Sequence, residues 1–404
     1  MNLKTILPLF FITLSTLLIA QEPVKLKFSG FVRNDFYFNS RQNMEAIDGT
    51  FQYFPKPIDN DILGNDKNAV PQSEMLSVAS RLILDVYGSP IFGAKSSAKI
   101  EGDFAGFSTS YYVFRIRHAY AKLNWENTEL LVGQTWHPLF GNVMPTTLSL
   151  NAGSPFQPFN RSPQIRLKYD LSKELSITTA AIYQMQYASL GPLGASNTYL
   201  KNAILPDFFL GTEYKTANWT SGIGADIKTI KPTVEKITSI SAVAYTQYVH
   251  IKFLLKAKAL WGENMSDLQM PWGYGISGSV DGNPTYTNFK MASSWINAVY
   301  GTKWQVGAII GYTQNLGTNK DLLPNAGKYT SYGLGNFAIA TDQILLDKAY
   351  RLAPHVSYNL SNIKVGVEYD LTSAEYGNLQ SNGRVLNPYT VRNHRAVVSM
   401  SYLF

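Results

Sequence analysis

The sequence predicts an all-β protein, a transmembrane antiparallel β-barrel of about sixteen strands. Three observations predict this fold class. Apolar and polar residues alternate with a period of two along most of the chain from Val24 onward. The connections between these alternating segments are short and long in turn. The chain begins with a segment typical of exported proteins, and its last alternating segment ends on an aromatic residue, Phe404.

Residues 1–20 have the pattern of a secretory signal peptide. One cation, Lys4, precedes an apolar stretch of about 15 residues that ends at the small residue Ala20. The alternative, a membrane anchor, needs about 20 apolar residues, and Pro8 interrupts this stretch. We therefore predict cleavage after Ala20 and one domain over residues 21–404, with 34 bases, 28 acids and a net charge of 34 − 28 = +6.

The composition fits a barrel wall. The chain has no cysteine, so an exported protein of this length is held by hydrogen bonds and packing alone. No later segment approaches 18 uninterrupted apolar residues, the signal of a transmembrane helix. Tyr, Phe and Trp together make up 53 of the 404 residues (25, 21 and 7), and two aromatic girdles would use them.

The first alternating segment, 24–38, places apolar residues on one face and charged residues on the other, as a soluble β-sandwich also would. The number and length of the segments decide between the two. We expect strands near 24–38, 75–88, 94–106, 112–125, 128–137, 163–170, 175–187, 206–216, 219–231, 237–249, 251–262, 288–300, 304–315, 349–360, 362–373 and 392–404. Most reach the roughly 9–11 residues that cross a bilayer at a tilt.

The connections are sorted by length. Short turns such as 126–128, 171–173 and 360–362 alternate with long segments near 39–74, 138–162, 188–205, 263–287 and 316–348. Short turns on one side and long loops on the other are typical of outer-membrane barrels, whereas a soluble barrel has no reason for this asymmetry.

The final segment alternates apolar residues up to Phe404, a pattern that resembles the signal read by the outer-membrane assembly machinery. We therefore expect the protein in the outer membrane of a Gram-negative cell, in contact with outer-membrane lipid and lipopolysaccharide.

The polar faces of such strands line the lumen, because a charge turned to lipid at mid-membrane costs about 2–4 kcal/mol. We expect carboxylates there too, such as Glu101, Asp103, Glu368 and Asp370, and some charges are expected to be ion pairs that fill the lumen. The cluster Arg115, Arg117 and Arg166 is interpreted instead as part of a selecting wall. The predicted pore-lining cations are Arg33, Arg81, Arg115, Arg117, Arg161, Arg166, Lys168, Arg351 and Arg395.

The long loop 137–163, after the fifth strand, is the candidate constriction. It carries Phe140, Phe156 and Phe159, and no Asp or Glu occurs between Glu129 and Asp170. An Arg/Lys wall without opposing carboxylates favours anions. In the alternative, this loop lies outside the barrel.

Two neighbouring segments of the chain resemble the DcaP-like porins and related specific anion porins. They are Phe114-Arg115-Ile116-Arg117-His118-Ala119-Tyr120-Ala121 and, after a turn, Leu131-Val132-Gly133-Gln134-Thr135-Trp136. The detailed match covers little beyond residues 114–136. The resemblance implies a trimeric, sixteen-stranded channel for small negatively charged molecules such as dicarboxylates. In sixteen-stranded porins, the loop after the fifth strand sets the constriction. Two features depart from the family: the first strand begins close to the cleavage site, without a coiled-coil extension, and the first long loop is acidic at Asp59, Asp61 and Asp66.

The sequence thus predicts passive diffusion of small hydrophilic, anionic solutes through a water-filled pore, with a homotrimer as a candidate assembly. The alternative is a non-conducting structural or partner-binding barrel of a secretion or surface-assembly complex. We expect no enzyme, because no G-x-S-x-G motif is present and the five histidines are scattered. No cofactor, metal site or nucleic-acid partner is expected, and the acidic first loop is interpreted as solvated rather than as a calcium site.

Overall fold

The computed structural model describes residues 24–46, 49–106, 110, 112–151, 153–339 and 342–404, and the predicted signal peptide lies outside them. Sixteen antiparallel strands of the described chain form a closed ring, in which each strand pairs with the next and the last pairs with the first. This confirms the predicted fold class. The strands of the ring are β1 (Lys25–Asn39), β5 (Arg81–Tyr87), β6 (Lys95–Asp103), β7 (Arg115–Asn124), β8 (Thr128–Trp136), β9 (Arg161–Asp170), β10 (Leu175–Ile182), β13 (Asp207–Lys215), β14 (Trp219–Ile230), β15 (Ile237–His250), β16 (Phe253–Glu263), β18 (Asn283–Gly301), β19 (Trp304–Thr318), β24 (Asp342–Leu360), β25 (Ile363–Leu379) and β26 (Val385–Leu403).

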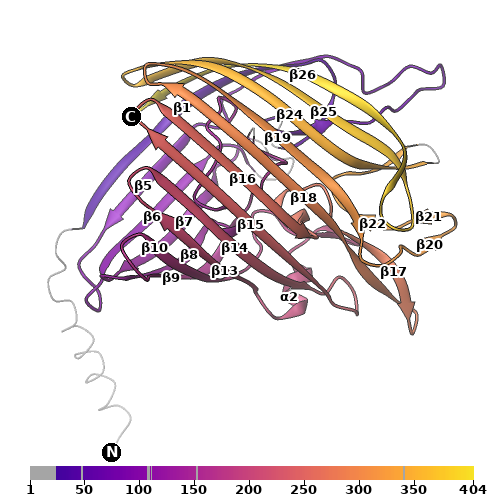
Figure 1. The fold of residues 1–404 in the computed structure, drawn as a ribbon, viewed down its shortest axis with the longest axis horizontal. Helices are drawn as coiled ribbons and strands as arrows, with labels where there is room; N and C mark the ends of the chain where they lie inside the picture. Colours follow the sequence, from indigo (N-terminus) through magenta and orange to yellow (C-terminus); the bar gives the residue numbers. More distant parts are fainter. Residues whose placement is uncertain (1–23, 47–48, 107–109, 111, 152, 340–341) are drawn as a thin grey trace, which may run out of the picture.

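The ring has two different ends (Figure 1). The short turns and the C-terminus lie at one end, at the left of the view, and the long connections extend from the other end. The long connections carry the remaining elements. These are β2 (Asn43–Ala46), β3 (Phe51–Pro55), β4 (Gln72–Leu76), η1 (Pro138–Phe140), β11 (Leu190–Gly191), β12 (Gly194–Ala195), α2 (Thr198–Ala203), η2 (Ser266–Leu268), β17 (Tyr274–Val280), β20 (Pro324–Asn325), β21 (Lys328–Tyr329), β22 (Ser331–Tyr332) and β23 (Asn336–Ile339). No helix in the described chain is long and apolar enough to span a membrane.

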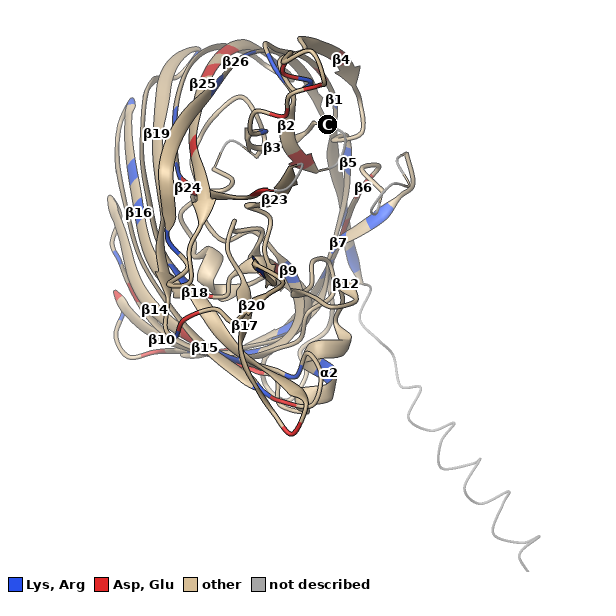
Figure 2. Cartoon of the chain, turned by 90° about the vertical axis from the view of Figure 1, so that its right-hand side faces the viewer, with Lys and Arg blue, Asp and Glu red and all other residues tan. Residues whose placement is uncertain are grey.

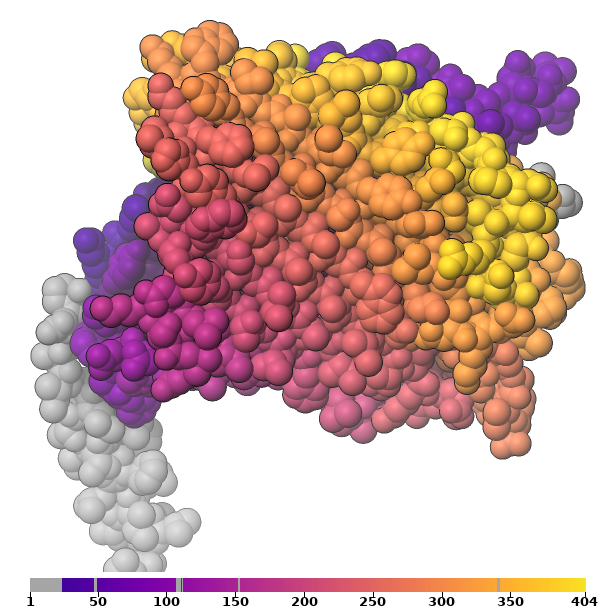
Figure 3. All heavy atoms as spheres, in the orientation of Figure 1, coloured from indigo at the N-terminus to yellow at the C-terminus, as the bar shows by residue number. Residues whose placement is uncertain are grey.

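The wall is apolar on its outside and polar on its inside. On β18, Ile296 is 58% exposed on the outer face, whereas its neighbour Asn297 is fully buried on the inner face. Such a distribution is the reverse of a soluble protein and is that of a barrel whose outer face meets lipid. Aromatic pairs, Trp219 with Tyr248 and Trp304 with Tyr358, lie on this outer face near the short turns. In the space-filling view, the outer wall from β13 to β26 is continuous (Figure 3).

The C-terminal residue completes the seam between β1 and β26. The N–H of Gly30 donates to the carbonyl of Phe404 at 3.0 Å, and the N–H of Phe404 donates back at 3.1 Å. A Cβ on Gly30 would lie 2.2 Å from the carbonyl oxygen of Arg81, so this close approach requires glycine. The period-two strand that ends at Phe404 therefore closes the ring.

The alternation placed the strands well, but several expected boundaries were wrong. The expected strand 75–88 is divided into β4 and β5, which both pair with β1. The expected loop 137–163 ends earlier, because β9 begins at Arg161. The final strands are also longer than expected, since β24, β25 and β26 continue to pair on the long-loop side.

Candidate functional site: two cavities in the lumen

The segment between β8 and β9, residues 137–160, crosses the inside of the barrel to the opposite wall. The N–H of Thr146 donates to Asn297 on β18 at 2.8 Å, and the N–H of Leu148 donates to Glu368 on β25 at 2.7 Å. The segment then returns to β9. We call it the inner loop.

Cations of the far wall hold the inner loop by its carbonyl groups. Arg33 donates to Leu148 at 2.7 Å, Lys256 donates to Met144 at 2.9 Å, and Lys258 donates to the carbonyl of Phe140. Arg351 donates to the carbonyl of Ser154 at 2.7 Å. These side chains therefore satisfy loop backbone groups that would otherwise be buried without partners.

A second segment also enters the lumen. The hairpin of β2 and β3 lies within the ring of strands (Figure 2), where Phe51, Tyr53 and Phe54 are buried. Arg351 donates to the carbonyls of Gln52 at 2.9 Å and Tyr53 at 3.1 Å, so the same guanidinium holds both inward segments.

The wall also binds the hairpin at two further points. Arg395 donates to the carbonyl of Gly49 at 2.8 Å, and the Tyr376 hydroxyl donates to the carbonyl of Pro55 at 2.5 Å. Sequence reasoning missed this hairpin. Its signal was the run Phe51-Gln52-Tyr53-Phe54, which is too apolar for a loop that lies entirely in solvent.

The first cavity, of about 210 Å³, lies between the two inward segments and the wall formed by β5 to β9. We call it the constriction cavity. One side is formed by Thr50 and Phe51 of the hairpin and by Met144, Leu150, Asn151 and Phe159 of the inner loop. The other side is charged and consists of Arg81, Glu101, Asp103, Arg115, Arg117 and Arg161, with His118 and Trp136 among them.

Three of these arginines are ion-paired. Arg115 lies 2.7 Å from Asp103, Arg117 lies 2.7 Å from Glu101 and 2.9 Å from Asp103, and Arg81 lies 3.4 Å from Glu101. The interpretation of Arg115 and Arg117 as cations without opposing carboxylates was therefore wrong. The carboxylates are absent from the inner loop but stand on the neighbouring strand of the same wall.

A β-bulge turns an additional residue toward this cavity. The register between β6 and β7 shifts at Glu101 and Gly102, so that both Arg117 and His118 are buried on the inner side. Strict alternation would have placed His118 on the lipid face with Ile116. Instead, its Nδ1 lies 2.9 Å from the hydroxyl oxygen of Thr135 on β8.

Arg161 differs from its neighbours, because no carboxylate of the described chain forms an ion pair with it. It is fully buried at the start of β9, and its guanidinium lies 3.8 Å from the Trp136 ring centroid. One donor, Nη1, contacts Gln186 at 3.1 Å, while Nε and Nη2 have no hydrogen-bond partner in the described residues.

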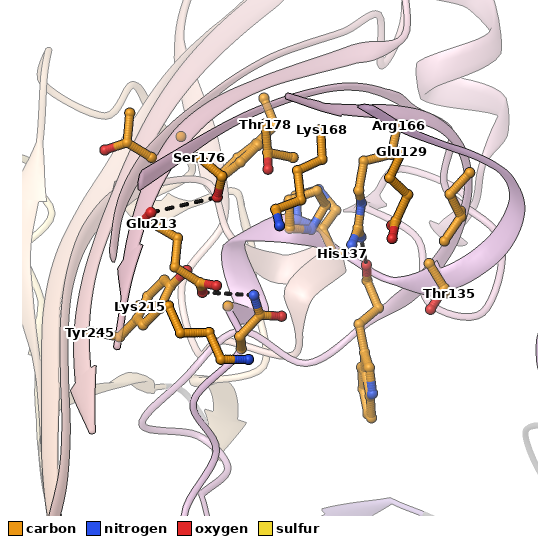
Figure 4. A pocket seen from close by; sticks show the side chains of 18 of the residues that line it. Glu129, Thr135, His137, Arg166, Lys168, Ser176, Thr178, Glu213, Lys215 and Tyr245 are labelled. Atoms are coloured by element: carbon orange, nitrogen blue, oxygen red, sulfur yellow. Dashed lines mark hydrogen bonds between the residues drawn. The ribbon is translucent and has the colours of Figure 1, made fainter. Parts of the chain in front are cut away.

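The second cavity, of about 540 Å³, lies on the short-turn side of the inner loop; we call it the vestibule (Figure 4). Arg166 donates to the carbonyl of Trp136 at 2.6 Å and to the side chain of Gln164 at 2.9 Å. Lys168 is half-exposed and lies 2.9 Å from Asp170. Glu213 accepts hydrogen bonds from Asn142 at 2.7 Å and from Tyr245 at 2.9 Å.

The nine predicted pore-lining cations thus occupy three kinds of position. Arg81, Arg115, Arg117 and Arg161 line the constriction cavity, and Arg166 and Lys168 line the vestibule. Arg33, Arg351 and Arg395 hold the inward segments instead; Arg33 and Arg351 are also paired with Asp35 at 2.8 Å and Asp370 at 3.0 Å.

The three predicted phenylalanines separate in a similar way. Phe159 lines the constriction cavity. Phe140 stacks on Trp136 at a centroid distance of 4.1 Å, and Phe156 packs on the far wall, where a Cβ on Gly311 would lie 2.6 Å from its ring. Phe140 and Phe156 therefore position the inner loop and do not line the constriction cavity.

The acidic first loop has its oxygens occupied by the chain itself. Asp61 accepts the N–H groups of Leu63 and Asn65, and Asp66 pairs with Arg41 at 2.8 Å. Among the described residues there is no group of His, Asp and Glu side chains with the geometry to hold a metal ion.

The architecture is that of sixteen-stranded outer-membrane channels. No family model and no curated protein matches the chain. Among solved structures, it is similar to the outer-membrane channel DcaP of Acinetobacter baumannii, with a TM-score of 0.71 and 20% identity over 94% of this chain and 97% of that one. This likeness agrees with the resemblance seen in the sequence.

More distant likenesses share the fold. The trimer form of OmpT from Vibrio cholerae has a TM-score of 0.53 and 11% identity, over 95% of this chain and all of that one. OmpF of Salmonella typhi in complex with daunomycin has a TM-score of 0.52 and 13% identity, over 95% of this chain and all of that one. The chain therefore has a porin fold.

Proposed function

We propose that the protein is an outer-membrane porin through which small hydrophilic solutes diffuse passively, anions in preference to cations. The observation that carries the proposal is the pair of polar cavities that follow one another along the lumen, on the two sides of the inner loop. A sixteen-stranded ring is wide enough to hold an aqueous channel.

The charge balance of the two cavities supports the preference for anions. The constriction cavity is lined by four arginines and two carboxylates, so its net charge is 4 − 2 = +2. The vestibule is lined by Lys122, Arg166, Lys168 and Lys215 against Glu129 and Glu213, which also gives 4 − 2 = +2. A lumen of one sign, with low-dielectric walls, concentrates solutes of the opposite sign.

Liposome swelling tests this function. Purified protein is reconstituted, and the entry of an anionic, a neutral and a cationic solute of matched size is compared. We expect fast swelling with the neutral solute, faster entry of the anion and slower entry of the cation. Liposomes that swell no faster than protein-free ones overturn the proposal of a porin, whereas faster cation entry overturns only the preference for anions.

The inward segments favour one alternative, a plugged structural or partner-binding barrel. The inner loop and the β2–β3 hairpin together bury Phe51, Tyr53, Phe54, Phe140 and Phe156 inside the ring. In that case swelling stays at the protein-free level and no current steps occur in planar bilayers. The porin proposal expects both signals.

We further propose that the outer membrane is its location and that three copies associate. The trimer form of the Vibrio cholerae protein, which has the same fold, supports the trimer. The mass of the detergent-solubilised protein, from size-exclusion chromatography with light scattering, is expected to correspond to three chains, and a single-chain mass contradicts the trimer.

A further inference from the structure

One side chain lines both cavities. Among the described residues, Trp136 is the one that lines both the constriction cavity and the vestibule. Beside it, the contact between His118 of the constriction cavity and Thr135 of the vestibule joins β7 to β8. Next to the inner loop, the indole ring and its immediate contacts therefore lie between the two cavities.

The indole is held by a stack that joins the wall to both ends of the inner loop. Phe140 is parallel to it, at 4.1 Å and an interplanar angle of 4°. Phe159 contacts the indole edge-on at a centroid distance of 4.8 Å. Arg161, the cross-strand partner of Trp136, lies over the indole ring at 3.8 Å from its centroid. Among aromatic side chains, Trp has the most favourable ring face for a cation, so Arg161 stabilises this position of the indole.

Arg161 is also the residue of this stack that can respond to a solute. Its Nε and Nη2 have no hydrogen-bond partner in the described chain, although the side chain is fully buried. A buried guanidinium without a carboxylate is costly, and an anion in the cavity that Arg161 lines would supply the missing acceptor.

We propose that Trp136 and Arg161 form a solute-operated partition between the two cavities. An anion in the constriction cavity accepts hydrogen bonds from Nε and Nη2 of Arg161 and draws the guanidinium away from the indole. The indole, which has then lost its guanidinium contact, changes rotamer, and the cavities connect. The anion shifts this equilibrium because its contacts with Arg161 are better in the open arrangement. This inference rests on the proposed porin function.

Single-channel conductance in potassium chloride tests the partition. Trp136→Ala is expected to raise the mean conductance by about twofold or more, because an apolar constriction that limits water is removed. Trp136→Leu, which keeps apolar bulk but loses the ring face for Arg161, is expected to give an intermediate rise. Trp261→Ala, on the lipid-facing side of β16, is the matched control and is expected to match the wild type.

Cysteine accessibility gives a second readout, since the chain has no native cysteine. Asn142→Cys places a thiol in the vestibule, and Met144→Cys places one in the constriction cavity. A sulfonate-bearing thiol reagent added on the vestibule side is expected to modify Asn142→Cys quickly in any background. Met144→Cys is expected to react about tenfold faster when Trp136→Ala is also present.

The variant Arg161→Gln tests the response to an anion separately from the barrier that Trp136 forms. In a protein with Trp136 intact, the bulkier HEPES anion is replaced by acetate at constant ionic strength. This exchange is expected to speed the reaction of Met144→Cys with the thiol reagent. In the Arg161→Gln background, that acceleration is expected to be lost.

If conductance and Met144→Cys reactivity are the same with and without Trp136→Ala, the proposed partition is overturned. The proposed porin function is not affected by that result. Absence of current from every variant, including the wild type, overturns the porin function itself.

Discussion

The lumen of this barrel contains two sets of arginines that look alike in sequence but do different things. Arg33, Arg351 and Arg395, on β1, β24 and β26, donate to the carbonyls of inward segments. Arg81, Arg115, Arg117 and Arg161, on β5, β7 and β9, face a cavity instead. A lumen-facing arginine is therefore not in itself a selectivity residue; the group that accepts its hydrogen bonds decides its role.

The largest expected effect is on stability, from the first set. Arg351→Gln leaves Asp370 and three loop carbonyls without their buried donor. Breaking a buried ion pair in this way costs about 3–5 kcal/mol. We expect the free energy of unfolding in urea, measured by tryptophan fluorescence in liposomes, to fall by that amount.

Lys168→Gln is the control for this prediction, because its half-exposed pair with Asp170 is worth about 0–1 kcal/mol. A loss in Arg351→Gln no larger than in this control would remove the distinction between the two sets.

The second set is expected to act on ion selectivity. Arg117→Gln lowers the net charge of the constriction cavity from +2 to +1, and Glu101→Gln raises it to +3. A unit charge at about 8 Å, with an effective dielectric constant of about 40, contributes about 1 kcal/mol, or about fivefold in the permeability ratio. Reversal potentials in a salt gradient are expected to shift in opposite directions for the two variants. If the reversal potentials of the two variants shift in the same direction, or do not shift, the solute path does not run through the constriction cavity.

The sequence predicted the wall better than its contents, for a physical reason. Alternation specifies which face of a strand a side chain occupies, and this was sufficient for the ring, the even strand number and the seam at Phe404. It does not specify register or bulges, so the pairing of Arg115 with Asp103 and the inward turn of His118 could not be read from one chain. The β2–β3 hairpin was missed because its contacts, such as Gln52 with Thr372, join residues far apart in sequence.

A weaker effect is expected in the vestibule. Glu213→Gln raises its net charge from +2 to +3, and the new amide can still accept from Asn142 and Tyr245. The vestibule is the larger cavity, about 540 Å³ against about 210 Å³. Salt screens charges beyond about 8 Å at physiological ionic strength. The permeability ratio is therefore expected to move toward anions by less than in Glu101→Gln. An equal or larger shift would make the vestibule the selecting cavity.

The smallest expected effect concerns Arg41, an arginine outside both sets. It pairs with Asp66 in the first long loop. Partial burial raises the pKa of Asp66, but the N–H groups of Asp59 and Asn68 and the Arg41 guanidinium outweigh it and hold the pKa below its usual value. The resulting stability is present above the usual carboxyl range and is lost as the pH falls through the lowered pKa.

The protection factors of the Asp59 and Asn68 amides, which compare each exchange rate with the unstructured rate at the same pH, are therefore expected to fall below about pH 4. Asp66→Asn is expected to remove that pH dependence. Protection factors that stay constant with pH in the wild type would contradict the role of this pair.

The reversal potential of the wild-type channel in a potassium chloride gradient tests the central claim most directly. With a net charge of +2 in each of two successive cavities, chloride is expected to carry most of the current. A reversal potential of the opposite sign, with potassium as the main carrier, would contradict the assignment of these cavities as the solute path.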